Sequence, residues 1–443
     1  MASRQSSPTG VKKATIASNE DKEKTVAIVN GIQELKYYES ILQDSVRASV
    51  VFVDSPGPEA IDEKTALDGL PIVGQENVNL EIEDLNDNIL SFSIQTDNAL
   101  YVNKVTPITD TSTKSMVLLD LVSKEHILNE KVRLNKRYNG LISEHVKTIL
   151  TDDNLLGTKK NVEVEQTIQN YNFIGNNKKS YYTINWLAMR SVSAENQEIG
   201  KTAGYFFYET SEGFFFKSID GLLSQEKKKS FIYNESPDKD GQVPAGYDEK
   251  VLAYTKDNRI DIQKKLMQGA YSSRVVVFDP FTNYYEVLTP VAEPTKTAGI
   301  KLPKLNPEFN REGKNKEYSR TTYMLLDRGT LPDGSTDDQI EKSGEENFKP
   351  KDTLNQAIMR YNQLFASGVE VTIAGDFSLH AGDVVFVDAP ELKTDTTNDE
   401  PNKQSGGLYI IADLCHYISP KGTYTKLNLC RDSFGRKGNH SSN

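Results

Sequence analysis

Side chains that commonly bind metals or carry redox chemistry are scarce in this chain. It has 443 residues but only 5 histidines and 2 cysteines. No two histidines stand at the HxH or HExxH spacing that brings two imidazoles to one zinc ion. We therefore expect no metal site, and we expect every histidine to be structural or solvated. The histidines are His126, His145, His380, His416 and His440.

The motifs that position phosphates or nucleophiles are missing as well. The sequence has no P-loop, no GxGxxG after a predicted strand and no GxSxG elbow. Residues 236–241 (SPDKDG) begin like a calcium loop, but Tyr247 stands where the bidentate Glu belongs, so we interpret them as a turn. The 63 Asp and Glu residues are expected to form a solvated surface. No catalytic, cofactor-binding or metal-ligating residue is predicted, and the chain is not expected to be an enzyme.

Composition predicts a folded chain of several domains. Hydrophobic residues make up 37% and charged residues 26% of a chain that is longer than one core supports. The net charge of -11 and the shortness of basic clusters such as residues 227–229 argue against tight nucleic-acid binding. No apolar run could cross a bilayer, and the first residues lack the apolar core of a signal peptide. We expect synthesis in a reducing cytoplasm and no membrane insertion.

The first part of the chain predicts strands between polar ends. Residues 1–24 and 435–443 are expected to be tails, or arms that become ordered on a partner. Residues 25–121 contain short β-rich segments separated by turn signals, which predicts a closed barrel or a sandwich. The predicted strands are residues 26–32, 46–53, 78–85, 89–94 and 116–121.

The middle of the chain predicts helices and then an aromatic hairpin. Residues 122–201 are expected to form a mixed α/β domain, with helices at 139–150 and 185–192. Two aromatic runs, 205–208 and 214–216, flank a short turn and predict a hairpin over residues 202–223. A hairpin in a core is the favoured interpretation, ahead of an aromatic platform for a ligand.

Residues 224–350 are expected to form a peripheral insertion. Its predicted elements are a helix at 260–267, strands at 274–278 and 284–288, and a long surface loop over 290–350 that is rich in Pro, Gly, Lys, Asn and Asp. A loop of that length is either disordered or functional, and an interface is the functional possibility.

Residues 351–434 predict a helix followed by strands. The helix is expected to begin at Asp352 or Thr353, to bury one stripe and to end at Gly368. The strands are expected at 369–373, 384–387, 408–418 and 423–431, with the last two joined in a hairpin by the turn 419–422. That turn pairs Tyr417 with Tyr424, Leu414 with Leu427, and Ala412 with Leu429. It places Cys415 and Cys430 about 13 Å apart, so we expect thiols and no disulfide.

A short internal echo links the two β-rich regions. VVFVDSP at residues 50–56 recurs as VVFVDAP at residues 384–390. The match is either coincidence or the trace of one barrel that was duplicated.

Seven short segments follow one another in a fixed order along the chain. They are 35–40 (LKYYES), 121–125 (LVSKE), 184–187 (INWL), 213–218 (GFFFKS), 382–385 (GDVV), 407–411 (GLYII) with His416, and 424–432. In this order they resemble the central baseplate hub protein of contractile-tailed, T-even-type and cyanophage-like myoviruses. The resemblance extends over residues 25–434, whereas the polar N-terminal tail and the extra length before Pro350 depart from the family pattern.

This resemblance implies an α+β, β-dominated fold with two tube-type antiparallel β-barrels and mixed α/β peripheral domains. It implies barrels over residues 25–121 and 351–434, with the hairpin 202–223 contributing to the second. It also implies a homotrimer whose six barrels form a ring that adapts the hexameric tail tube to the trimeric central spike. Implied partners are the central spike protein, tail tube or tube-initiator proteins, baseplate wedge proteins and DNA in transit. No cofactor is implied.

Two other functions stay open at this point. One is a host-attachment or spike-associated protein that binds glycans through the loops between residues 279 and 350. The other is a tail-associated hydrolase. Glycan binding by the isolated chain would favour the first, and loss of a hydrolytic activity on replacement of one carboxylate would favour the second.

Overall fold

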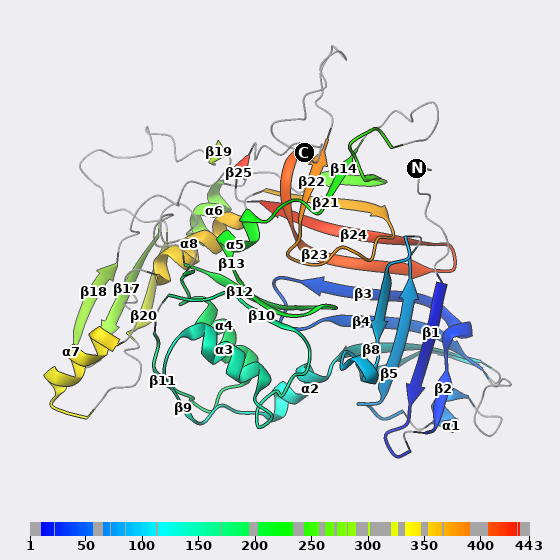
Figure 1. Ribbon diagram of the computed structural model, residues 1–443, viewed down its shortest axis with the longest axis horizontal. Helices are drawn as coiled ribbons and strands as arrows, with labels where there is room; N and C mark the ends of the chain where they lie inside the picture. The colour runs from blue at the N-terminus through cyan, green and yellow to red at the C-terminus, as the bar shows by residue number, and fades with distance from the viewer. Residues whose placement is uncertain are drawn as a thin grey trace, which may run out of the picture.

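The computed structural model describes most of the chain, and its described residues are 10–21, 23–55, 65–70, 72–84, 86–111, 114–168, 170–194, 203–233, 243–256, 262–269, 273–280, 282–288, 300–301, 320–326, 333–346, 353–365, 367–389, 406–431 and 433–434. One 15-stranded sheet dominates, with a small α/β part and a separate three-stranded sheet beside it (Figure 1). The expected β-dominated α+β class is confirmed. No described helix is long and apolar enough to cross a membrane.

The N-terminal lobe of the large sheet consists of β1 to β8. Its strands alternate buried and more accessible side chains, as β4 shows along its whole length, and the inward residues form one apolar core. Alternation of this kind makes one face of a sheet apolar. The strands are β1 (Gly10–Ala17), β2 (Thr25–Ala27), β3 (Ile32–Ser40), β4 (Arg47–Asp54), β5 (Asn77–Glu83), β6 (Ile89–Phe92), β7 (Leu100–Asp110) and β8 (Ser115–Ser123), with the short helix α1 (Ala66–Gly69) after β4.

Four of these strands differ from the prediction. β1 lies inside the segment predicted to be a tail, where it pairs with β5 and β2 and buries Ala14 and Ile16. β3 and β7 were not predicted, and the strand predicted at 26–32 is β2 followed by the 3-10 turn Val29–Gly31. β1 is polar, and it is stabilised by hydrogen bonds to its neighbouring strands. The sequence of β1 alone does not reveal those neighbours, so the strand was not predicted. The C-terminal tail, 435–443, lies outside the described residues.

The C-terminal lobe surrounds a second apolar core. Residues 249–256 link two of its strands, because Val251 N donates to Ile232 O of β14 and Leu252 N donates to Thr372 O of β21. The strands are β14 (Lys229–Ile232), β15 (Glu249–Lys250), β16 (Ala253–Lys256), β21 (Ser367–Ala374), β22 (Val384–Asp388), β23 (Gly407–Ser419) and β24 (Gly422–Arg431).

The two lobes share one sheet. β3 pairs antiparallel with β23, from Leu35 opposite Ile418 to Ser40 opposite Asp413. The prediction of two separate closed barrels is therefore corrected for the described residues. Each lobe offers an edge strand, and pairing those edges satisfies backbone groups that would otherwise be left open. Figure 1 shows β3 and β4 running beside β23 and β24 at this join.

The β23–β24 hairpin confirms most of its predicted register. Tyr417 lies opposite Tyr424, and Leu414 lies opposite Leu427. The pairing predicted for Ala412 is wrong, because a β-bulge between Ile411 and Asp413 places Ile411 opposite Leu429. A bulge inserts one extra residue into one strand and shifts all pairs beyond it. Neither Cys415 nor Cys430 is in a disulfide, as expected.

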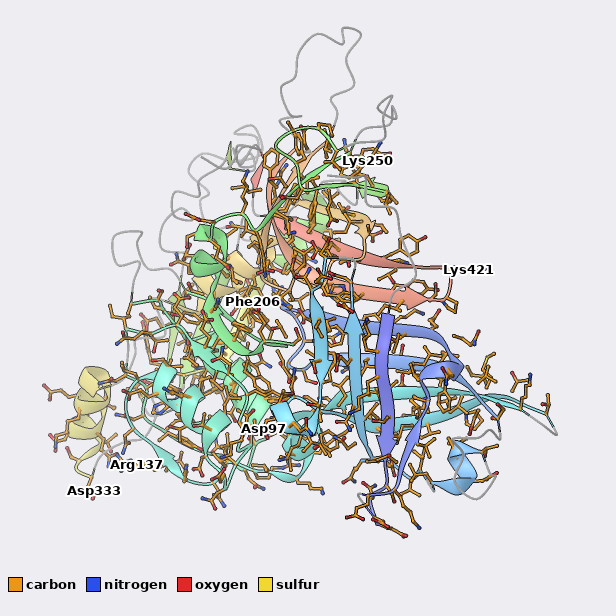
Figure 2. All side chains as sticks on the ribbon, turned by 45° about the vertical axis from the view of Figure 1, so that its right-hand side comes forward. Asp97, Arg137, Phe206, Lys250, Asp333 and Lys421 are labelled. Atoms are coloured by element: carbon orange, nitrogen blue, oxygen red, sulfur yellow. The ribbon has the colours of Figure 1, made fainter. Side chains whose placement is uncertain are left out.

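The aromatic hairpin lies between the α/β part and the C-terminal lobe. It forms its own sheet with β10, in the order β10-β13-β12, and does not pair with the large sheet as predicted. Phe207, Phe214 and Phe216 enter the core of the α/β part, whereas Phe206, Tyr208 and Phe215 pack with the C-terminal lobe. Both faces of the hairpin are thus buried, one in each core. Phe206 is labelled in Figure 2 where the hairpin meets that lobe.

The α/β part follows β8 directly. Its predicted helices are found with shifted bounds, at Ile142–Thr151 and Ser180–Ala188. The elements are α2 (Lys124–Lys131), β9 (Arg137–Tyr138), α3 (Ile142–Thr151), β10 (Val162–Val164), β11 (Phe173–Ile174), α4 (Ser180–Ala188), β12 (Tyr205–Thr210), β13 (Gly213–Ser218) and α5 (Ile219–Ser224).

The peripheral part carries a three-stranded sheet in the order β18-β17-β20. Its helix and first two strands were predicted, but β20 and α7 lie where a continuous loop was expected. α8 ends at Leu364, and Gly368 belongs to β21. The turn predicted at 236–241 and most of 290–319 lie outside the described residues. The elements are α6 (Ile262–Gln268), β17 (Ser273–Asp279), β18 (Tyr284–Leu288), β19 (Ile300–Lys301), β20 (Arg320–Leu325), α7 (Thr336–Glu346), α8 (Leu354–Leu364) and β25 (Ser433–Phe434).

Candidate functional site

The histidines are spread over the fold and do not converge on a metal. His145 Nε2 lies 2.9 Å from Tyr171 O in the α/β part, and His126 lies beside Tyr181 with ring centroids 6.5 Å apart. His416 is fully buried, with Nδ1 2.9 Å from Thr425 Oγ1. Burial lowers the pKa of His416 to about 4. No group of three metal-binding side chains occurs in the part of the chain that the structure describes, and His440 lies outside it.

His380 instead belongs to a buried polar cluster at the join of the two lobes. The cluster is centred on Glu39 of β3, whose side chain is 0% exposed. Glu39 Oε1 accepts from Tyr37 Oη at 2.9 Å and from Ser211 N at 2.8 Å, and it lies 3.3 Å from His380 Nδ1. Glu39 Oε2 accepts from Ala381 N at 3.0 Å. One carboxylate therefore holds β3, the turn of the aromatic hairpin and the β21–β22 loop together. We call these residues the Glu39 cluster.

The charges of the Glu39 cluster support each other. Burial alone would raise the pKa of Glu39, but the charge of His380 and the hydrogen bonds to the carboxylate lower it. Burial alone would lower the pKa of His380, but Glu39 raises it. His380 Nε2 also lies 3.5 Å from the exposed Glu212 carboxylate. The opposite shifts favour an ion pair between a carboxylate and an imidazolium.

A second buried cluster joins the N-terminal lobe to the α/β part and the hairpin. Lys160 Nζ lies 3.0 Å from Glu125 Oε2 and 2.6 Å from Glu209 Oε1, and these three side chains are at most 4% exposed. Thr158 Oγ1 donates to Glu125, and Val46 N donates to Glu209 Oε2. Burial opposes the charge of Lys160, but the two carboxylates raise its pKa. We call this the Lys160 cluster.

Sequence reasoning missed both clusters, although each left a local signal. Glu39 stands two residues after Tyr37 and four after Leu35, so all three side chains point to the buried face of β3. Glu209 lies in β12, where every residue is buried. A carboxylate at a buried position needs a partner, because burying an unpaired charge is very costly. The partners themselves come from segments far away in the chain, so their identity was not predictable.

A groove crosses the outer face of the join. It has a volume of about 700 Å³ and is lined by side chains of β3, β4, β21, β23 and β24. At Glu370, Asp413 and Asn428 it continues into a second hollow of about 720 Å³ that reaches α6 and α8. Both volumes are of the size of small-molecule sites, but neither hollow is an enclosed pocket.

Charges of both signs line this groove. Lys36, Arg47 and Lys426 stand against Glu370 and Asp413. Asp413 accepts from Ser40 Oγ at 2.5 Å and from Asn428 Nδ2 at 3.2 Å, and Lys36 lies 2.6 Å from Glu34. Lys36 and Lys426 both lie over the Tyr417 ring, at 5.6 and 5.5 Å. The face is polar and close to charge balance.

The groove does not place an activated nucleophile. Cys415 lines it, but burial raises the pKa of its thiol to about 11, so the thiol is protonated near neutral pH. A thiolate is the reactive form of cysteine. The groove is thus a polar surface whose one thiol is not activated.

No family model and no curated protein matches the chain. Among solved structures, the tail protein from Neisseria meningitidis MC58 is similar, with a TM-score of 0.51, 9% identity and coverage of 96% of this chain and 98% of that one. The 43 kDa tail protein of prophage MuSo2 from Shewanella oneidensis has a TM-score of 0.49, 11% identity and coverage of 96% and 99%. Prophage tail protein gp18 from Listeria monocytogenes EGD-e has a TM-score of 0.43, 8% identity and coverage of 95% of each chain. At these identities the likeness concerns the fold alone, and the fold is one that the Neisseria tail protein also has.

Proposed function

We propose that this chain is a structural subunit of a phage tail baseplate, and specifically the central hub of a contractile tail. In this role three copies form a ring that adapts the hexameric tube to the trimeric central spike and surrounds part of the DNA ejection channel. The protein then acts in the virion, after assembly in the cytoplasm of a bacterial host. Its neighbours are the spike, tube or tube-initiator proteins and wedge proteins.

The observation that carries the proposal is the single sheet through both lobes, in a fold shared over almost the full length with a tail protein. Two β lobes fixed side by side give each subunit two similar units. Three such subunits supply six units to one closed ring, and a closed ring satisfies every copy of its interface. A trimer can thereby match both a sixfold and a threefold neighbour.

The buried clusters support this role because a ring must hold its lobes at a fixed angle. The Glu39 and Lys160 clusters connect the lobes with the hairpin and the α/β part through charged hydrogen bonds. The balanced charge of the outer groove also suits a surface beside passing DNA, since a strongly basic wall would retain the phosphate backbone.

Mass photometry of the purified chain, alone and with the spike protein, tests the proposal. We expect a species of three times the 49.6 kDa chain mass, and class averages along the axis of purified tails that show threefold or sixfold features around a central hole. A chain that stays monomeric with its spike partner, or that is absent from purified tails, would contradict the proposed function.

A further inference from the structure

The two lobes of the large sheet have the same strand order. The N-terminal lobe runs β3-β4-β8-β7-β5-β1-β2, and the pairs of the C-terminal lobe give the order β16-β21-β24-β23-β22-β14-β15. Each pair of neighbours from β3 to β5 is antiparallel, as is each pair from β16 to β22. The lobes differ in the direction of the first strand, since β1 is antiparallel to β5 whereas β14 is parallel to β22. Matching strands also follow each other in the same order along the chain, so the lobes are two versions of one fold.

A β-bulge and a turn recur at matching positions in the two lobes. β7 has a bulge at Asn103 against β8, as β23 has at Ala412 against β24. In the turn before the next strand of each lobe, the carboxylates of Glu76 and Asp383 each accept from the backbone N–H three residues earlier at 2.8 Å. These repeated details fix which residues of the two lobes correspond. The VVFVD echo in the sequence does not follow this match, because β4 corresponds to β21 and not to β22.

The join of the lobes uses two edges of this repeated fold. One edge of β23 pairs with β22 along residues 407–410 and then with β3 along residues 413–418. β7 corresponds to β23, and its first residues pair with β5 in the same way. Among the described strands, however, none pairs with that edge of β7 along residues 104–109. β16 corresponds to β3, and β21 is its one partner among the described strands. The two edges that meet in the join are thus each present a second time without a described partner strand.

Both of these second edges are exposed, whereas the matching edges in the join are buried. Counting from the bulges, Pro107 of β7 takes the place of His416, which is 0% exposed in the join. Pro107 is exposed, and Ile108 after it is 51% exposed. Thr255 and Lys256 of β16 are exposed as well. An open sheet edge is a template for a further strand, and a proline with bulges is a common protection against unspecific pairing. The edge of β7 therefore favours one matching strand over general aggregation.

We propose that β16 of one copy of this chain pairs with the open edge of β7 in a second copy, and so repeats between chains the join that β3 and β23 form within the chain. The occupant is a second copy, because the two open edges are the two halves of a contact that the chain already makes once. The halves differ, so the contact is head-to-tail, and such contacts close into a ring or extend into a filament. The inference rests on the proposed function only for closure of the ring at three copies.

The join within the chain fixes the register of the proposed pair. In the join, Lys36 lies opposite Tyr417. Thr255 takes the place of Lys36, because the cross-strand pairs that start at each of them lead to the residue directly after the bulge. Ile108 takes the place of Tyr417, and a second bulge of β7 at this point sets both Ile108 and Thr109 opposite one residue. Side chains directly opposite each other have Cβ atoms about 4.5 to 5.5 Å apart, which is close to disulfide spacing.

Disulfide trapping tests this contact in a Cys415→Ser background, where Cys430 is the one remaining cysteine and is buried. Ile108→Cys chains co-expressed with Thr255→Cys chains should give covalent dimers on mild oxidation. Neither variant alone should do so, because a head-to-tail contact takes one residue from each edge. Ile94→Cys is the matched control for Ile108→Cys, since Ile94 is also 51% exposed in the N-terminal lobe but lies outside β7. Its dimer yield with Thr255→Cys should be at least tenfold lower.

The outcomes separate this inference from the proposed function. A chain that carries both Ile108→Cys and Thr255→Cys should give a covalent ladder that ends at three chains. If mass photometry finds trimers but neither Ile108→Cys nor Thr109→Cys is trapped with Thr255→Cys above the Ile94→Cys control, the inference is wrong while the proposed function stands. If the ladder continues past three chains, the edges pair as inferred but the proposed ring of three is wrong. Efficient trapping of Ile108→Cys with itself would show a face-to-face contact and overturn the inference.

Discussion

Replacing Glu39 by Gln tests whether one carboxylate holds the join together. Gln keeps the size of the side chain but turns one acceptor oxygen into a donor and removes the charge that pairs with His380. Breaking a buried ion pair costs about 3 to 5 kcal/mol. Glu39 also accepts from Ser211 N and Ala381 N. The free energy of local opening at those two amides should fall by the same amount of about 3 to 5 kcal/mol. Their hydrogen exchange should therefore accelerate roughly hundredfold or more.

Hydrogen-exchange mass spectrometry of peptides that contain residues 205–218 and 376–384 measures this effect. Glu34→Gln on the same strand is the matched control, because the Glu34–Lys36 pair is about 30% exposed on each side and surface pairs contribute less than about 1 kcal/mol. Unchanged exchange at Ser211 and Ala381 in the Glu39 variant would refute the role of the carboxylate, as would an equal effect of both substitutions.

The pH dependence of this opening provides an independent check. The raised pKa of His380 means that its stabilisation is complete below the unfolded value of 6.5 and is lost as pH rises through the folded pKa. The lowered pKa of Glu39 means that its stabilisation is complete above 4.5 and is lost as pH falls through the folded pKa. Protection should be greatest between pH 4.5 and 6.5 and should fall on the alkaline side. Glu39→Gln should remove that alkaline fall, and its persistence would count against the pair.

Three further predictions concern single positions. Lys160→Met leaves two buried carboxylates without their cation, so thermal denaturation should show that the free energy of unfolding falls by about 3 to 5 kcal/mol. Lys159→Met is the control, because the Lys159 side chain is 59% exposed, and it should change stability little. Gly213→Ala should destabilise by several kcal/mol, because φ is +136° and the added Cβ would lie 2.2 Å from Asn161 O, whereas Gly10→Ala meets only a flexible lysine side chain. The Cys415 thiol, with its pKa raised to about 11, should react with iodoacetamide about tenfold faster for each pH unit from 7 to 10, and a plateau near pH 8 would refute the shift.

The strands that could be predicted are those whose own side chains alternate. β4, β8 and the β23–β24 hairpin each carry apolar residues at every second position, so their existence follows from the sequence. β3 was missed because Glu39 interrupts the inward apolar series, and β1 was missed because its inward residues are few. The bulge at Ala412 leaves no trace in the local pattern, since either register keeps apolar residues on one face.

The contacts that join the lobes could not be predicted, because each brings together residues that are distant in the chain. Lys160 follows a turn, Glu125 begins a helix and Glu209 lies in a hairpin. These side chains come together only when β3 pairs with β23 and the aromatic hairpin packs against both lobes. The sequence has 63 Asp and Glu residues, which were expected to be solvated. That expectation is wrong for Glu39, Glu125 and Glu209, which are buried.

The join of the two lobes uses buried charges and not apolar residues alone, and the backbone N–H groups around Glu39 explain why. An isolated buried ion pair can often be replaced by apolar side chains at no cost. Glu39 differs because it accepts from two backbone N–H groups, Ser211 in the hairpin turn and Ala381 in the β21–β22 loop. These donors belong to turns and would lose an acceptor if Glu39 became Leu, at a cost of about 1 to 3 kcal/mol each. The Glu39→Leu/His380→Leu pair should therefore be less stable than the parent chain, and a stability equal to the parent would refute the view that the carboxylate is required by the turns.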